Sequence, residues 1–162
     1  MIVVSDTSPI SNLIVIGNLN ILITLFQDIY IPPKVFAEIL RLEEFNINVS
    51  EIKNSNSIKI KSASNAQLIQ DLKETLNEGE SEAIALAKEL EADYILIDER
   101  KGRKIAEQMG IKSIGLLGIL LKAKEKRVFE RIAPILNALR EEAGFWISDI
   151  LYHDILMQAN EI

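Results

Sequence analysis

The chain has 162 residues, 48% of them hydrophobic, with a formal net charge of −6 and no cysteine. This length predicts one domain over residues 1–162, the acidic balance argues against a general polyanion-binding surface, and the missing cysteines exclude disulfides and thiolate chemistry. No apolar run approaches the roughly 18 residues of a membrane span and no signal peptide is recognisable, so we expect a cytoplasmic protein with no membrane partner.

The chain begins with a predicted buried strand at Ile2–Ser5, because short β-branched runs suit a strand that is covered on both faces. Asp6 follows the C-terminal end of this strand, where open α/β sheets place their ligands. Thr7 and Ser8 are suited to cap a following helix, and Pro9 suits its first turn. A carboxylate in this position needs hydrogen bonds or a cation, so Asp6 is the first candidate site residue.

The elements up to residue 76 follow from helical apolar spacing, turn residues and one alternating run. We predict helices over Ser8–Ile16, Leu19–Phe26, about Pro33–Arg41 and Asn65–Leu76, and strands at Tyr30–Ile31 and Ile58–Lys61. The last of these strands alternates apolar and polar residues, which is typical of an exposed edge. Residues 42–57 are polar and rich in Asn and Ser, and we predict a loop or flap there.

The second half of the chain contains a strong helix at Gly79–Leu90, with alanines, leucines and acids in its first turn. Tyr94–Ile97 is the second clear buried strand, and it also ends on a carboxylate, Asp98. The remaining predicted elements are a basic helix at Arg100–Met109, a strand at Ile111–Ile114, and helices over about Leu116–Lys124, Arg131–Glu142 and Ser148–Asn160.

The alternation of strands and helices predicts a parallel sheet with right-handed crossovers in a three-layer α/β domain. The strands that begin at Ile2 and Tyr94 are the most apolar, so we expect them to be central. If they are adjacent and parallel, Asp6 and Asp98 emerge side by side at one edge of the sheet.

Six acids are candidates for a shared site: Asp6, Glu38, Glu80, Glu82, Asp98 and Glu99. Apart from Asp6, each also has a structural explanation; Asp98, for example, is well placed to cap the basic helix that follows it. Glu80 and Glu82 lie about 200° apart around a helix, so both cannot face one site from within it. Glu80, at the helix start, can cap the helix or reach a second metal.

Several carboxylates at one sheet edge repel one another unless a hard cation lies between them. Mg²⁺ and Mn²⁺ prefer such oxygen ligands and keep several waters. With one or two such ions, a metal-bound water can attack a phosphodiester while the metal stabilises charge on the phosphate. The carboxylates therefore predict a metal site, although no fixed spacing defines this chemistry.

Other chemistries fit less well. The glycines form neither GxGxxG after a strand nor a Walker A loop, and no GxSxG is present. The only histidine, His153, is interpreted as a helix surface residue, and Trp146 as an anchor for the last helix. A phosphoacceptor domain would need an acidic pair near the first strand, and a dehalogenase-type phosphatase an acid where Ser8 stands.

Three long segments resemble the PIN-domain family: VVSDTSPISNLIVIGNLNILITLF, IYIPPKVFAEIL and LNEGESEAIALAKELEADYILIDERKGRKIAEQMGI. The resemblance is to the branch of short, stand-alone predicted nucleases; it extends through the tail GFWISDILYHDIL and is weakest over residues 42–65. The order DTSP, IPPxVxxE, GExEAIALA and LIDERKGR is specific, whereas any one of these motifs alone is not.

The resemblance implies an α/β/α sandwich around a parallel sheet of about five strands, and a metal-dependent ribonuclease that uses Mg²⁺ or Mn²⁺ and a water nucleophile. By position, the catalytic and metal-binding acids of the family correspond to Asp6, Glu38, Glu82 and Asp98. Thr7 is expected to orient the first acid or a metal-bound water, while Glu80 and Glu99 are neighbours without an assigned role.

The resemblance also implies that the protein forms a homodimer and is a toxin with a cognate antitoxin. Residues 100–131 carry ten Lys/Arg against three Glu. We expect Arg100, Lys101, Arg103 and Lys104, together with the basic residues of 122–131, to line a groove for RNA. The alternative is a catalytically weak or inactive PIN-fold module that binds nucleic acid or protein.

Overall fold

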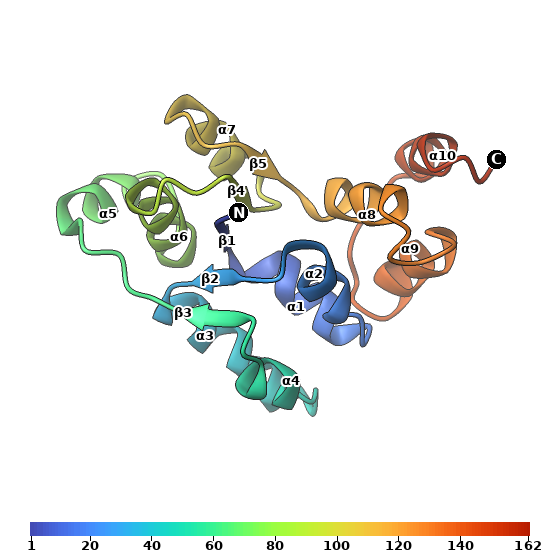
Figure 1. Cartoon of the computed structure of the whole chain (residues 1–162), viewed down its shortest axis with the longest axis horizontal. Coiled ribbons are helices and arrows are strands. Elements are labelled where there is room, and N and C mark those ends of the chain that lie inside the picture. The colour runs from blue at the N-terminus through green and yellow to red at the C-terminus, as the bar shows by residue number, and fades with distance from the viewer.

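A five-stranded parallel sheet forms the centre of the protein, in a computed structural model that describes residues 1–162. Helices cover both faces of the sheet, as Figure 1 shows, so the predicted three-layer α/β/α class is confirmed. The strand order is β3-β2-β1-β4-β5, with β1 (Val3–Ser5), β2 (Ile29–Ile31), β3 (Ile58–Ile60), β4 (Tyr94–Leu96) and β5 (Ser113–Ile114).

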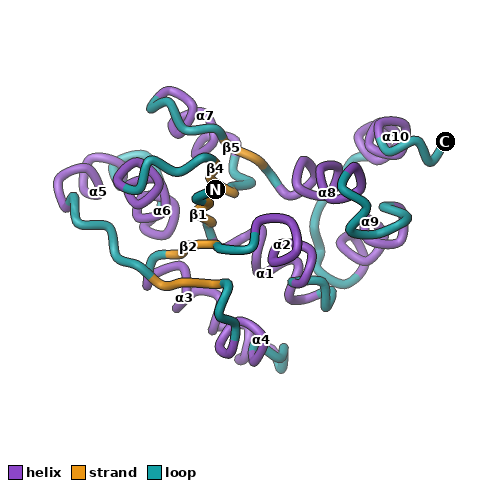
Figure 2. The backbone as a smooth tube through the Cα atoms, viewed as in Figure 1, coloured by secondary structure: helices purple, strands orange, loops and turns teal.

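The strands are short and most of the remaining chain is helical (Figure 2). None of the helices combines the length and the apolar character that a membrane span requires. The helices are α1 (Thr7–Val15), α2 (Asn20–Phe26), α3 (Pro33–Leu40), the 3₁₀ helix η1 (Arg41–Phe45), α4 (Ser50–Asn54), α5 (Ala66–Leu72), α6 (Glu78–Glu89), α7 (Arg100–Gln108), α8 (Leu116–Glu125), α9 (Ala133–Glu141) and α10 (Asp149–Gln158).

Successive strand residues supply two separate cores, because side chains alternate between the faces of a sheet. Val3 packs with α1, α2, α3 and α8, whereas Val4 and Ile95 pack on the opposite face with α5, α6 and α7. All three side chains are completely buried. This covering of both faces explains why the strands are continuous apolar runs rather than alternating ones.

Strands β1 and β4 are adjacent and parallel, with Ser5 opposite Leu96. The backbone N–H of Asp6 donates to the carbonyl of Leu96 over 2.9 Å, which joins the two strand ends. The prediction that these strands are central and bring Asp6 and Asp98 to the same edge is confirmed.

The predicted loop at residues 42–57 is wrong, because η1 and α4 lie within it. Val49 and Ile52 are 2% exposed and join the larger core. A five-residue helix has too few apolar side chains to show a helical period in the sequence. Because the surrounding residues are mostly polar, the segment was interpreted as a loop.

The C-terminal end of the chain is held by Glu161, whose side chain is 7% exposed. It accepts hydrogen bonds from the backbone N–H of Ile132 at 2.6 Å and from Lys124 Nζ at 3.0 Å, with Ala133 N–H at 3.2 Å. Although desolvation raises the pKa of this carboxyl, its hydrogen bonds and the lysine charge outweigh that effect and lower the pKa. Glu161 therefore ties the end of α10 to α8 and to the start of α9.

Trp146 does not anchor the last helix, contrary to the sequence interpretation, because it is 81% exposed. The neighbouring Ile147 is buried in its place, and its carbonyl accepts a 2.8 Å hydrogen bond from Arg140. His153 lies exposed on α10, as expected.

Candidate active site

A cavity of about 420 Å³ lies at the carboxyl ends of β1 and β4. Its wall contains five carboxylates, a single lysine and only one hydrophobic side chain. The lining residues are Asp6, Thr7, Ser8, Ser11, Glu38, Thr75, Leu76, Asn77, Glu80, Asp98, Glu99 and Lys101. Segments far apart in the sequence thus bring negative charge to the place where open α/β sheets bind ligands.

Asp6 is one of the two buried acids of this cavity and is 7% exposed. It is the N-cap residue of α1, yet its side chain makes no capping hydrogen bond. Desolvation by burial is the main reason that its pKa is raised to about 7, and the charges of Glu80, Glu38 and Asp98 add to this effect against the Thr7 backbone N–H. Asp6 can therefore exchange a proton near neutral pH.

Glu38 reaches the cavity from α3, where its helix begins at the predicted proline pair. The hydroxyl of Thr7 donates to Glu38 Oε2 over 2.6 Å. Thr7 therefore does not cap α1 as its sequence position suggested, because its hydroxyl is directed across to α3. This contact fixes the second acid relative to the first.

Glu80 lies in the first turn of α6 and is 5% exposed. It forms a capping box with Asn77: its Oε1 accepts from the Asn77 backbone N–H at 3.2 Å, and the Asn77 side chain accepts from the Glu80 N–H at 2.8 Å. The other oxygen, Oε2, is buried and has no hydrogen-bond partner. Desolvation, with Glu99 and Glu38 nearby, raises the pKa of Glu80.

Asp98 does not cap the basic helix α7, whose N-cap residue is Glu99. Asp98 instead accepts from the backbone N–H of Leu116 at 2.6 Å, at the start of α8, and from the Ser8 hydroxyl at 2.8 Å. Ser8 likewise holds Asp98 rather than capping α1. Desolvation raises the pKa of Asp98, although these donors and the charge of Arg103 act in the opposite direction.

Glu82 does not line the cavity. The charged groups around it are Glu78, Lys34, Lys73 and Glu38, and burial followed by the Glu78 charge raises its pKa. The reason is the helical rotation of about 200° between Glu80 and Glu82, which allows only one of them to face the site. In the structure the residue on the cavity wall is Glu80, whereas Glu82, to which the resemblance assigned the third acid, lies outside the wall.

The predicted RNA-binding residues lie in different surroundings. Lys101 lines the cavity, Arg100 and Lys104 are exposed elsewhere on α7, and Arg103 lies half-buried beside Asp98. Lys122, from the second basic stretch, lies 5.4 Å from the ring centroid of Tyr94, at the opposite end of β4 from Asp98. The two basic stretches therefore belong to different ends of the sheet.

Three glycines pack directly against three of the site acids. A Cβ atom at Gly79 would lie 2.8 Å from Glu38 Oε1, and one at Gly102 would lie 3.2 Å from Glu80 Oε2. A Cβ at position 115, also a glycine, would lie 3.3 Å from Asp98 Oδ1. The carboxylates thus occupy space that a larger residue at these positions would fill.

The donor set fits a hard divalent cation, because the cavity presents carboxylate and hydroxyl oxygens and no sulfur or imidazole. The unpartnered buried Oε2 of Glu80 also fits such a ligand, since a buried carboxylate oxygen without a donor is costly. No group of three or more acids is already arranged as a metal-ligand set. Binding would therefore require carboxylates such as Glu38 and Asp98 to turn from their present hydrogen bonds.

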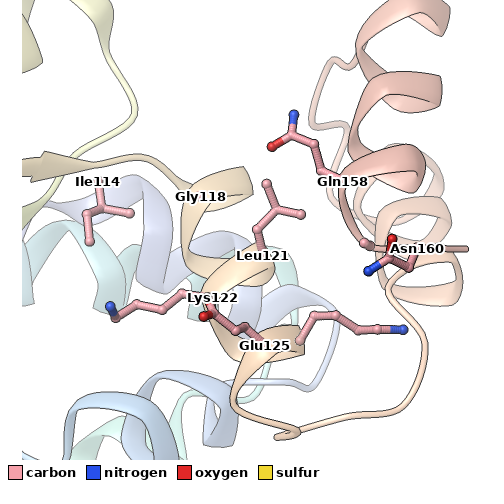
Figure 3. A pocket seen from close by; sticks show the side chains of 9 residues that line it. Ile114, Gly118, Leu121, Lys122, Glu125, Gln158 and Asn160 are labelled. Carbon is pink, nitrogen blue, oxygen red and sulfur yellow. The ribbon is translucent and has the colours of Figure 1, made fainter.

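A larger cavity of about 620 Å³ lies between α8 and the end of α10, and its lining side chains are drawn in Figure 3. It contains one carboxylate, Glu125, and two lysines whose ammonium groups are engaged elsewhere. Lys122 lies over Tyr94, and Lys124 binds Glu161. This cavity lacks the convergent acids of the first one and is not the candidate active site.

Comparison with known proteins agrees with the arrangement of the sheet. A family model described as a PIN domain matches residues 2–161. Among solved structures, a PilT N-terminus domain protein from the hyperthermophilic archaeon Sulfolobus solfataricus is similar, with a TM-score of 0.50 and 18% identity over 76% of this chain and 93% of that chain. A comparison with curated proteins found no match.

Proposed function

Because the chain belongs to the PIN-domain family, whose fold is a nuclease fold, we propose that it is a metal-dependent endoribonuclease that hydrolyses RNA phosphodiester bonds. The observation that carries the proposal is the cavity at the ends of β1 and β4, where Asp6, Glu38, Glu80 and Asp98 converge. Four acids this close together repel one another and destabilise the fold, so a purely structural role does not explain why they converge.

The residues that would hold Mg²⁺ or Mn²⁺ are Asp6, Glu38, Glu80 and Asp98. When bound, such a cation would supply an acidified water and stabilise the charge that develops on the phosphate. It would also offset the desolvation and the mutual repulsion that raise the pKa of Asp6 and Glu80.

The other groups of the cavity have complementary roles in this proposal. In the metal-free protein Thr7 and Ser8 hold Glu38 and Asp98 through hydroxyl hydrogen bonds, which these acids would exchange for contacts with the cation. Asp6, the acid at the end of β1, would bind the cation in its ionised form, although burial raises its pKa to about 7 in the metal-free protein. Lys101 is the only cation on the cavity wall and can contact a phosphate oxygen of the substrate.

The test is cleavage of a mixed pool of single-stranded RNA in Mg²⁺ or Mn²⁺, with Asp6→Asn and EDTA as comparisons. We expect cleavage that requires the metal and is lost in the variant. Absence of cleavage by wild-type protein that is folded and binds Mn²⁺ indicates a restricted RNA target. Absence of both cleavage and metal binding contradicts the proposal.

A second candidate is a catalytically inactive PIN-fold module that binds nucleic acid or protein. It is favoured by one observation, that no three acids are already placed as metal ligands. Isothermal titration with Mn²⁺ separates the two candidates, because only the enzyme requires a divalent site. A toxin role with an antitoxin partner, and assembly as a homodimer, are extensions of the first proposal that co-purification and sedimentation would test.

A further inference from the structure

Helix α10 has an exposed apolar stripe on the side that faces away from the protein. Ile150 is 85% exposed and Met157 is 56% exposed. These two residues are seven apart, which places them on one line along the helix, two turns from each other, with the exposed His153 and Asp154 on the turn between them. Trp146, four residues before Ile150, is 81% exposed and extends the apolar surface past the start of the helix.

The opposite side of α10 is already packed. Ile155, Leu156 and Ala159 are buried in the main core against α8 and its neighbours. The helix is therefore apolar on two sides, whereas a surface helix normally keeps a single apolar stripe for the core. In Figure 1, α10 is the outermost helix at the C-terminal end of the molecule. Its outer stripe remains without a partner in the single chain.

The surroundings of the stripe are acidic. Residues 141–162 contain four exposed acids, Glu141, Glu142, Asp149 and Asp154, and no Lys or Arg, while the fifth acid, Glu161, is covered and bound to Lys124. Asp149 is fully exposed and Asp154 is exposed beside the stripe, while Glu141 and Glu142 lie exposed at the end of α9. Arg140 reaches Asp149 at 3.3 Å, but it also stacks on Tyr152 and is only 28% exposed. The charge presented to an approaching partner is therefore negative.

We propose that the outer face of α10 is a docking surface for a basic amphipathic helix of another protein. The apolar residues Trp146, Ile150 and Met157 would contact the apolar side of that helix, and Asp149 and Asp154 its flanking Lys or Arg residues. A second copy that packs α10 against α10 fits less well, because helices that meet at a two-fold axis would bring the acids of the two faces together. This surface is separate from the acidic cavity, so the proposal does not rest on the nuclease activity.

The experiment uses Trp146 itself as the reporter, because it is the only tryptophan of the chain and is exposed. The full-length protein is titrated with a leucine–lysine amphipathic peptide of about 15 residues, long enough to form a helix. A leucine–glutamate peptide of the same pattern is the matched probe. We expect a saturable blue shift of the tryptophan emission with the lysine peptide, weakened by added salt, and none with the glutamate peptide.

Two surface variants assign the two parts of the interaction. Ile150→Ser with Met157→Ser removes the stripe, and we expect the lysine peptide to bind at least about tenfold more weakly, as expected for loss of central apolar contacts. Asp149→Asn with Asp154→Asn removes the charges, and we expect about threefold to tenfold weaker binding that has lost its salt dependence. Phe45→Ser, at another exposed apolar residue, is the control that should leave binding unchanged.

Three results would overturn the proposal. The first is an equal shift with both peptides, and the second is unchanged binding by the Ile150/Met157 variant. The third is a blue shift that appears with rising protein concentration and no peptide, which would assign the face to a second copy of the chain. Far-UV circular dichroism of each variant checks the fold, which should be retained because the substituted side chains are exposed.

Discussion

Two places in this protein hold buried carboxylates, and the surroundings of those carboxylates are opposite in kind. In the cavity, Asp6 is desolvated among other acids, and its pKa is raised to about 7. At the C-terminus, Glu161 is equally covered but accepts bonds from two backbone N–H groups and Lys124, and its pKa is lowered. The ionised form of a carboxyl side chain is thus destabilised in the cavity and stabilised at the C-terminus.

This difference separates a site from a structural contact. A carboxylate that strengthens the fold is supplied with donors, as Glu161 is. The cavity acids lack sufficient donors, and the buried Oε2 of Glu80 has none. Such an arrangement costs stability in the free protein and leaves oxygens available for a ligand. Each prediction below changes one side of this contrast.

The largest effect is expected for Asp6→Asn on RNA cleavage. Removing the charge at the centre of the cavity should lower the cleavage rate by about 10³-fold, equivalent to roughly 4 kcal/mol of transition-state stabilisation. Initial rates at saturating Mn²⁺ measure it, with EDTA-treated wild type as the background. A variant that retains more than about a tenth of the activity would show that Asp6 is not at the reacting centre.

Glu80 and Glu82 provide the next comparison, because they are two residues apart on α6 and have the same charge. Glu80→Gln should lower cleavage by about 10²-fold, whereas Glu82→Gln should change it by less than about threefold. The physical reason is that only Glu80 faces the cavity. Parallel rate measurements on both variants test this assignment, and the reverse order of effects would restore Glu82 as the third acid.

Stability should change with pH in a direction set by Asp6. Because its folded pKa is raised from 3.8 to about 7, Asp6 costs the metal-free fold stability as pH rises through this window. The full shift corresponds to an upper limit of roughly 4 kcal/mol. We expect Asp6→Asn to stabilise the protein by about 2 kcal/mol near pH 8 and by almost nothing near pH 4. Urea unfolding in EDTA measures this; equal stability at both pH values would contradict it.

Glu161→Gln should destabilise the fold, in contrast to Asp6→Asn, and leave the cavity unchanged. Loss of the charge weakens three hydrogen bonds, so we expect destabilisation by about 1–3 kcal/mol near pH 7. Because the pKa of Glu161 is lowered, this stabilisation should fade as pH falls below its ordinary range. Urea unfolding checks it, with the exposed Glu142→Gln as control. Cleavage per folded molecule should stay unchanged.

The smallest effect concerns Lys101, the only cation on the cavity wall. Lys101→Ala should raise KM for RNA by about fivefold and reduce the salt dependence of binding, since one phosphate contact is lost. Arg100→Ala, one residue away but outside the cavity, should change KM by less than about twofold. Equal effects of the two substitutions would indicate a diffuse basic surface in place of a specific contact.

Much of the architecture followed from local physical rules. The most apolar strands, Ile2–Ser5 and Tyr94–Ile97, were predicted to be central, and β1 and β4 are. From this alone Asp6 and Asp98 were expected at one edge, because parallel strands end together. The strong apolar pattern of the strands made this part predictable, since burial on both faces leaves little choice of residue.

The details of the site depended on contacts that sequence spacing does not encode. Thr7 and Ser8 suit a helix cap equally well, and only the folded packing directs their hydroxyls to Glu38 and Asp98. The choice between Glu80 and Glu82 required the orientation of α6 about its own axis. The helical period excluded that both faced the site, but it gave no basis for choosing between them.

The three glycines beside the acids have a consequence for the natural variation of this protein. An added methyl group would press on Glu38 at Gly79, on Ile97 and Glu80 at Gly102, and on Arg103 and Asp98 at Gly115, without altering any charge. Substitutions there are therefore steric probes of the three acids and of the side chains packed beside two of them. They also give a search pattern for related chains: where alanine replaces one of these glycines, the acid that it contacts should be shortened or absent as well, because the two share one volume.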